Sequence, residues 1–210
     1  KNPYGSIHRR VHDIMEIGYN GPIGIDLTSH DDLQNIEISE MIDETNGYKV
    51  WCDFVQNIEH PCIVPVLQVL LGGDDMNISQ QAQRLYEIFG LFIVRLDAEL
   101  TKQEIFNILE ATLNGAPADS IILVYDQGFT DIRYQASHIE DAKEKLEFIS
   151  QTGPFHSVAL CASSFPKSVT APGYGDDEES SHFGIAEVLI HENVRRNFPH
   201  LIYGDYCGVH

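Results

Sequence analysis

The stretches Leu91-Phe-Ile-Val-Arg-Leu-Asp97 and Ser120-Ile-Ile-Leu-Val-Tyr-Asp126 decide the fold of this chain. Each is a short apolar run rich in β-branched and aromatic side chains, and each ends on an aspartate. Between them, apolar residues from Ile105 to Leu113 recur at helical spacing. Continuous apolar runs are typical of strands that are covered on both faces, as in parallel sheets. The pattern therefore predicts a βαβ unit with both aspartates at the carboxyl ends of its strands.

The same alternation continues along the chain from residue 61. Strands are predicted over residues 62–71, 91–97, 120–126, 155–162 and 201–205, with helices over 79–89, 101–113, 137–149 and 182–197. Capping boxes, in which a hydroxyl and a glutamate satisfy the first amides of a helix, are predicted at Thr101–Glu104 and Ser137–Glu140. Strands in this alternation are typical of a βα barrel or an open doubly wound sheet. Because a complete barrel needs more strands, we expect an α/β, TIM-barrel-like fold that is incomplete or truncated.

Residues 1–60 do not share this clean alternation. They predict an amphipathic helix over 6–18, a brief strand over 23–27 and an irregular remainder with a turn signal at Asn46-Gly47. We therefore expect residues 1–60 to pack on a βα-repeat core formed by 61–210. Because the chain starts at a lysine in a loop-like stretch, we also expect it to belong to a longer gene product or to lack its ends. Residues 167–181 are rich in Gly, Pro and acidic residues, which predicts a long loop or lid.

The charge of the chain is its strongest compositional feature. Its 32 acidic and 13 basic residues give a net charge of −19, so direct binding of nucleic acid is not expected. The acidity fits a basic protein partner, a metal ion, or simply a solvated surface. No apolar run approaches the roughly 20 residues of a membrane span. Four cysteines occur without a C-x-x-C pair, which favours a reducing cytoplasm.

Aspartates close several of the predicted strands. Asp26, Asp97, Asp126 and Asp205 would meet at one end of a parallel sheet. Close carboxylates repel unless a cation or a shared proton relieves them, so such a ring would suit Mg²⁺ or Mn²⁺ or general acid–base catalysis. We take Asp97, Asp126 and Asp205 as catalytic candidates and Asp97 and Asp126 as metal candidates. The alternative is that each aspartate forms a turn or caps a helix.

Other polar residues near the strand ends are candidates for ligand binding. Arg95 alternates with Val94 and Leu96, so it could hold a phosphate or carboxylate group or form a structural ion pair. Ser163 and Ser164 follow a strand and are typical of an anion-binding loop or a turn; Tyr203 lies on the last strand. Glu187 could lean over the mouth of the sheet or lie on the helix surface.

Known catalytic motifs are missing from the chain. No G-x-S-x-G elbow surrounds the serines, no H-E-x-x-H occurs, and no glycine-rich dinucleotide or Walker motif occurs. Whether the chain is an enzyme is therefore left open, and no cofactor is certain.

Several stretches together resemble the phage-type beta protein family, which is known from a T4-like phage protein and occurs in phages and bacteria. They are Pro22-Ile-Gly-Ile-Asp26-Leu, Phe92-Ile-Val-Arg95-Leu96, Ile121-Ile-Leu-Val-Tyr-Asp126, Ala159-Leu-Cys-Ala-Ser163-Ser164-Phe165-Pro166 and Leu201-Ile-Tyr203-Gly204-Asp205-Tyr206. The resemblance implies a barrel-like α/β domain and a role in phage–host biology. It implies no particular reaction.

Two functions follow from these observations. The first is a cytoplasmic component that recognises a protein or ligand in phage–host conflict, in antiphage defence or counter-defence, with a protein as the expected partner. The second is a metal-dependent hydrolase of phosphoesters or glycosides that uses the strand-end aspartates with Arg95. A purely structural role for the aspartates is the third possibility.

Overall fold

The computed structural model describes residues 21–27, 35–58, 60–165 and 185–205, together with 9, 11, 13 and 16. The predicted loop 167–181 and most of the predicted helix 6–18 lie outside these residues. The strands are β1 (Ile23–Ile25), β2 (Ile63–Pro65), β3 (Phe92–Asp97), β4 (Ile121–Phe129), β5 (Ser157–Ser163) and β6 (Ile202–Asp205). The helices are α2 (Ile36–Met41), α3 (Thr45–Gln56), α4 (Asp75–Phe89), α5 (Lys102–Gly115), α6 (Gln135–Ser150) and α7 (Ala186–Arg195), with short 3-10 helices η2 (Ala118–Ser120) and η3 (Ile132–Tyr134).

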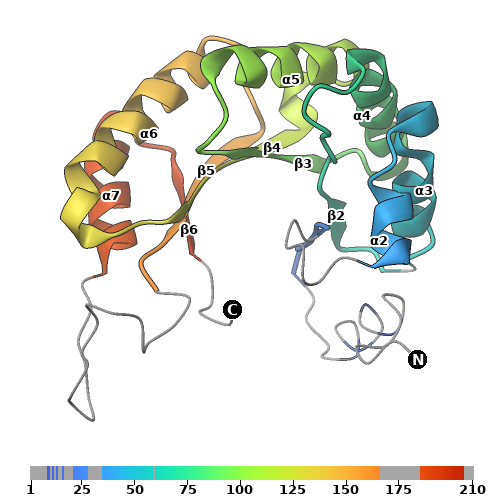
Figure 1. Ribbon diagram of the computed structural model, residues 1–210, viewed down its shortest axis with the longest axis horizontal. Coiled ribbons are helices and arrows are strands. Elements are labelled where there is room, and N and C mark those ends of the chain that lie inside the picture. The colour runs from blue at the N-terminus through green and yellow to red at the C-terminus, as the bar shows by residue number, and fades with distance from the viewer. Residues whose placement is uncertain are drawn as a thin grey trace. The chain divides into compact units, whose positions relative to one another are not determined.

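The fold is mixed α/β, with strands and helices alternating along the chain (Figure 1). Strand β1 pairs in parallel with β2, and a second sheet has the strand order β3-β4-β5-β6. Strand β5 is parallel to both β4 and β6. The prediction of parallel βα units is confirmed, whereas closure into a TIM barrel stays a prediction. None of the described helices is long and apolar enough to cross a membrane.

The described chain forms two compact units. Unit 1 comprises residues 1–94 and 107–120, and unit 2 comprises 95–106 and 121–210. The predicted division at residue 60 stays a prediction.

Unit 1 packs α3 and α4 around a buried tryptophan. Trp51 is fully buried, stacks on Phe54 with ring centroids 5.8 Å apart, and donates from Nε1 to the Val66 carbonyl at 2.9 Å. The turn signal at Asn46-Gly47 is confirmed, because Asn46, Gly47 and Tyr48 all have positive φ at the start of α3. A Cβ at Gly47 would lie 2.7 Å from the Gln80 Cβ, so glycine allows α3 and α4 to approach.

The predicted strand over 62–71 is wrong beyond its first residues. Only Ile63–Pro65 is a strand, followed by a single bridge between Val66 and Ile93. Beyond that bridge, side chains satisfy the backbone: Gln81 bonds both the amide and the carbonyl of Gln68, and the Tyr48 hydroxyl accepts from the Leu70 amide. In this part of the run, hydrogen bonds from side chains therefore take the place of a neighbouring strand.

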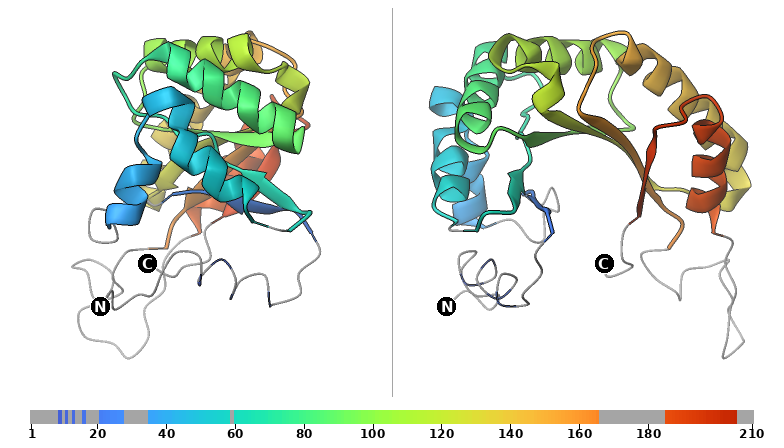
Figure 2. Two further views of the ribbon diagram at one scale, coloured as in Figure 1. Left: turned by 90° about the vertical axis from the view of Figure 1, so that its right-hand side faces the viewer. Right: turned by 180° about the vertical axis from the view of Figure 1, so that it is seen from behind.

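Unit 2 holds the strands β4, β5 and β6, with α6 and α7 lying alongside each other (Figure 2). Tyr125, Leu160 and Leu146 are buried between this sheet and its helices. The strand predicted over 120–126 continues to Phe129 across an irregularity between Asp126 and Phe129, where Gly128 has φ of +60°.

The two predicted capping boxes have different outcomes. At the start of α5 the box is confirmed: the Thr101 amide donates to Glu104 Oε2 at 2.7 Å, and the Glu104 amide donates to Thr101 Oγ1 at 3.3 Å. The box at Ser137–Glu140 is wrong, because α6 already begins at Gln135. The preceding turn η3 is capped by Asp131, whose Oδ1 accepts from the Arg133 amide at 2.8 Å, and the chain runs from it directly into α6.

Candidate functional site

The candidate site lies at the carboxyl ends of the strands in unit 2. The Ala98 amide donates to the Asp126 carbonyl at 2.8 Å. In a parallel ladder this bond places Asp97 directly beside Asp126 on the neighbouring strand. The structure therefore brings two of the predicted carboxylates together.

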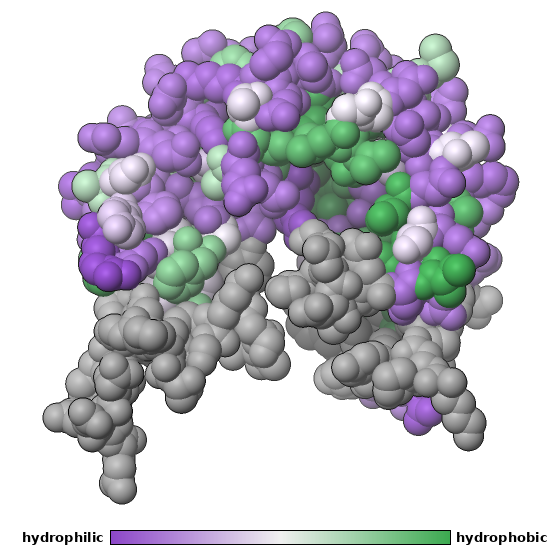
Figure 3. Space-filling model, viewed as in Figure 1, coloured by the Kyte–Doolittle hydropathy of each residue, from purple (hydrophilic) through white to green (hydrophobic). Residues whose placement is uncertain are grey.

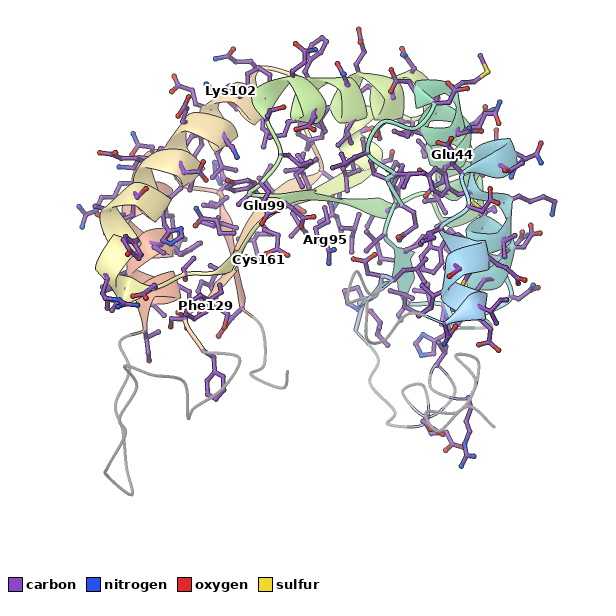
Figure 4. All side chains as sticks on the ribbon, viewed as in Figure 1. Glu44, Arg95, Glu99, Lys102, Phe129 and Cys161 are labelled. Carbon is purple, nitrogen blue, oxygen red and sulfur yellow. The ribbon has the colours of Figure 1, made fainter. Side chains whose placement is uncertain are left out.

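The register of the sheet places residues of β5 and β6 in one row with Asp97 and Asp126. Asp126 pairs with Cys161, and Cys161 pairs with Gly204. Arg95 precedes Asp97 by two residues and therefore shares its face of the sheet. Figure 4 shows Arg95 and Cys161 projecting on the side of the strands away from the helices. We call this side the open face of unit 2, which comprises Arg95, Asp97, Ile122, Val124, Asp126, Cys161 and Gly204.

Apolar and charged groups lie next to each other on the open face. Ile122 and Val124 are half-buried. Figure 3 shows that the outer surfaces of the helices are largely hydrophilic by comparison. A face of this kind can contact both the apolar and the charged part of a ligand.

Arg95 forms an ion pair with Asp97 on this face. Its Nε lies 3.6 Å from Asp97 Oδ1, and the two side chains are 32% and 60% exposed. Because solvent screens such a pair, it contributes little to stability. The predicted structural ion pair is present, and it leaves Asp97 accessible from solvent.

Asp126 is the buried carboxylate of the site. It is 7% exposed, and its Oδ1 accepts a hydrogen bond of 2.8 Å from the Gly128 amide. A buried carboxylate is costly unless hydrogen bonds or a positive charge stabilise it. A cationic group placed against Asp126 and Asp97 would therefore bind favourably.

Cys161 is a neutral thiol rather than a nucleophile. Burial raises its pKa to about 11, the Asp126 carboxylate adds to the rise, and the Arg95 guanidinium opposes it. The thiol packs over Gly204, where a Cβ would lie 2.2 Å from Sγ. Reactive cysteines need a lowered pKa, so the open face does not favour thiol chemistry.

Asp205 does not join the other two carboxylates. It pairs with Ala162, one position beyond the row of Asp126, so it lies on the opposite face of the sheet. Burial and the negative charges of Asp205 and Glu187 raise the pKa of Tyr203, and the Tyr203 ring meets His191 edge-on with centroids 5.3 Å apart. Asp26 belongs to unit 1, where it accepts from Gln68 Nε2 at 2.9 Å.

The two serines have partners within the chain. Ser163 Oγ accepts from the Phe165 amide at 3.2 Å. The Ser164 amide donates to Glu187 Oε2 at 3.0 Å, and the Ser164 hydroxyl donates to the same oxygen. Glu187 is therefore buried rather than on the helix surface, because it anchors the first turn of α7 to the end of β5.

Sequence reasoning missed a buried polar layer between β4 and α6. The Tyr125 hydroxyl donates to Asp141 Oδ2, and Gln127 Nε2 donates to the His138 carbonyl at 2.8 Å. Within the described part of the chain, Gln127 Oε1 and Thr130 Oγ1 are buried without a hydrogen-bond partner. The only sequence signal is the polar run that follows Tyr125 in a strand, and it does not distinguish the two faces.

Metal binding is not assigned by the geometry. Within the described residues, no group of three or more His, Cys, Asp or Glu side chains is arranged to hold a metal ion. If the chain binds Mg²⁺ or Mn²⁺ on the open face, Asp97 and Asp126 are the carboxylates that would hold the ion.

Fold and site together define a mixed α/β protein with paired carboxylates at the ends of parallel strands. The family model described as Beta protein matches residues 8–210, and the chain belongs to the Beta protein family. Protein beta of Enterobacteria phage P4 is 26% identical over 200 residues, which cover 93% of this chain and 53% of that protein. The chain thus spans about half the length of the curated relative it matches. No solved structure matches it.

The family resemblance drawn from the sequence is therefore confirmed. That resemblance was to a T4-like phage protein, whereas the relative found belongs to phage P4.

Proposed function

We propose that this chain is a cytoplasmic recognition component in phage–host conflict, acting in antiphage defence or in counter-defence. Its similarity to a phage protein supports the setting. The binding role rests on one observation: Asp97 and Asp126 lie side by side on the open face of unit 2. The free thiols of Cys52 and Cys161 are compatible with a reducing cytoplasm.

The chemistry of the open face favours a basic protein partner. Asp126 is buried and Asp97 is exposed beside it, so a lysine or arginine side chain could reach both. The net charge of −19 attracts basic surfaces over long range and disfavours nucleic acid. Ile122 and Val124 offer apolar contact for the stem of the same side chain.

Capture of partners from phage-infected cells tests this role. The tagged chain is compared with Asp97→Asn/Asp126→Asn and with Asp119→Asn, which changes an exposed aspartate that is not part of the open face. We expect the unaltered chain and Asp119→Asn to retain a common basic partner at low salt and to lose it at high salt. The double variant should not retain it. A set of captured proteins that is the same for all three chains and insensitive to salt would contradict the role.

A metal-dependent hydrolase of phosphoesters or glycosides is the second candidate, favoured by the same pair of carboxylates. Because a cation that binds only the folded state raises stability, Mg²⁺ or Mn²⁺ should then raise the melting temperature. This rise should vanish in Asp97→Asn and Asp126→Asn. If neither ion raises the melting temperature, the hydrolase is contradicted, and binding of a protein partner remains as the role of the two carboxylates.

We also propose that the βα units belong to a TIM-barrel-like fold. The parallel pairing of β4, β5 and β6 and the helix between each pair of strands support this. Sites in such folds lie at the carboxyl ends of the strands, where Asp97 and Asp126 are found.

A further inference from the structure

Unit 2 is also hollowed at the opposite ends of its strands. A cavity of about 400 Å³ opens between the connection from α6 to β5 and the connection from α7 to β6. Its volume is within the range of roughly 300–1,000 Å³ that is typical of small-molecule sites. It lies at the amino ends of β5 and β6, away from the carboxylates of the open face.

Aromatic rings frame this cavity. Phe155 and His156 precede β5, and Phe198 and His200 precede β6, so each connection contributes a phenylalanine and a histidine. Leu146 and Ile149 of α6 are buried side chains of the same lining. Rings on two connections around an apolar base favour a flat ligand that stacks on them.

The polar groups of the cavity indicate the charge of its ligand. Its lining, all of it within the described chain, contains no Asp, Glu, Lys or Arg. Asn197 and Ser150 add hydrogen-bonding groups to the two histidines. The net charge of −19 would also repel an anionic ligand. The lining therefore suits an uncharged molecule with a few hydrogen-bonding atoms.

We infer that this cavity is a binding site for an uncharged planar aromatic ligand that carries hydrogen-bonding heteroatoms. The site is independent of the proposed recognition by the open face, because it lies at the other end of the strands and shares no residue with it.

Two fluorescent probes test the inference on the full chain. N-phenyl-1-naphthylamine is uncharged and planar in its ring systems, and 8-anilinonaphthalene-1-sulfonate has the same skeleton with an added sulfonate. We expect saturable fluorescence enhancement for the uncharged probe and binding about tenfold or more weaker for the sulfonate. Equal binding of both probes, or no saturable enhancement, would overturn the assignment.

Substitutions then place the probe in the cavity. His156→Ala/His200→Ala removes two exposed rings and should weaken binding about tenfold or more. Ser150→Trp should abolish binding by filling the space, and His138→Ala, on α6 outside the lining, should leave it unchanged. Circular dichroism establishes that each variant is folded. If folded double-histidine and Ser150→Trp variants bind like the unaltered chain, the probe is elsewhere and the inference is wrong.

Discussion

Replacing Gln81 by leucine should destabilise unit 1 far more than its small change in volume suggests. Gln81 is fully buried on α4. Its Oε1 accepts from the Gln68 amide at 2.7 Å, and its Nε2 donates to the Gln68 carbonyl at 3.0 Å. Leucine fills a similar space but can form neither bond, so a buried amide and a buried carbonyl lose their partner.

The expected cost follows from these two groups. An unpaired buried donor or acceptor costs about 1–3 kcal/mol, so two cost about 2–6 kcal/mol. The more apolar leucine side chain offsets about 1 kcal/mol of this. We therefore expect the free energy of unfolding to fall by about 1–5 kcal/mol. With a urea dependence of about 2 kcal/mol per molar, the unfolding midpoint should fall by about 0.5–2.5 M.

Tryptophan fluorescence measures this change directly. Trp51 is the single tryptophan of the chain, and it is buried in unit 1 beside the segment that Gln81 holds. Gln83→Leu is the matched control, because Gln83 lies exposed on the same helix and its side chain bonds, among the described residues, only to Glu87. If the midpoint of Gln81→Leu equals that of Gln83→Leu, the side-chain support of the segment after Val66 is refuted.

Three further predictions concern unit 2. Thr101→Ala should lower the free energy of unfolding by about 1 kcal/mol in urea titrations, because it removes the cap of α5, whereas an unchanged midpoint would contradict the capping box. Gly204→Ala should lower the free energy of unfolding by about 1–3 kcal/mol, because the added methyl group displaces the Cys161 thiol, and Cys161→Ala should remove most of this penalty. Additive effects of the two substitutions in a double-mutant cycle would refute the pairing of Cys161 with Gly204. Because burial raises the pKa of Cys161 to about 11, its alkylation by iodoacetamide, followed by mass spectrometry, should keep accelerating above pH 9. An alkylation rate that levels off at pH 9 would contradict the burial of this thiol. For the same reason, the stability that the protonated Cys161 thiol contributes is present below pH 9 and is lost as the pH rises towards 11.

The sequence predicts the βαβ unit around β3 and β4 well, because both strands are largely apolar runs and are flanked by clear helix signals. It fails for the run after Pro65, because the partner of that backbone is the side chain of Gln81, and periodicity cannot reveal a long-range polar contact. The run is apolar in either case.

The candidate site is only partly predictable. That Asp97 and Asp126 lie together follows from two strands that both end on aspartate. That Asp205 lies on the other face depends on a register difference of one residue, which moves a side chain through the sheet. The burial of Glu187 depends on its bond with Ser164, for which the sequence carries no local signal.

Plaque formation by a panel of phages tests the central claim most directly. Host cells express the unaltered chain, Asp97→Asn/Asp126→Asn, or the Asp119→Asn control. We predict that the unaltered chain and the control change the efficiency of plating of at least one phage, up or down, and that the double variant returns it to the value of cells without the chain. A folded double variant that acts like the unaltered chain would contradict recognition by the open face, and no effect of any chain would contradict the role in phage–host conflict.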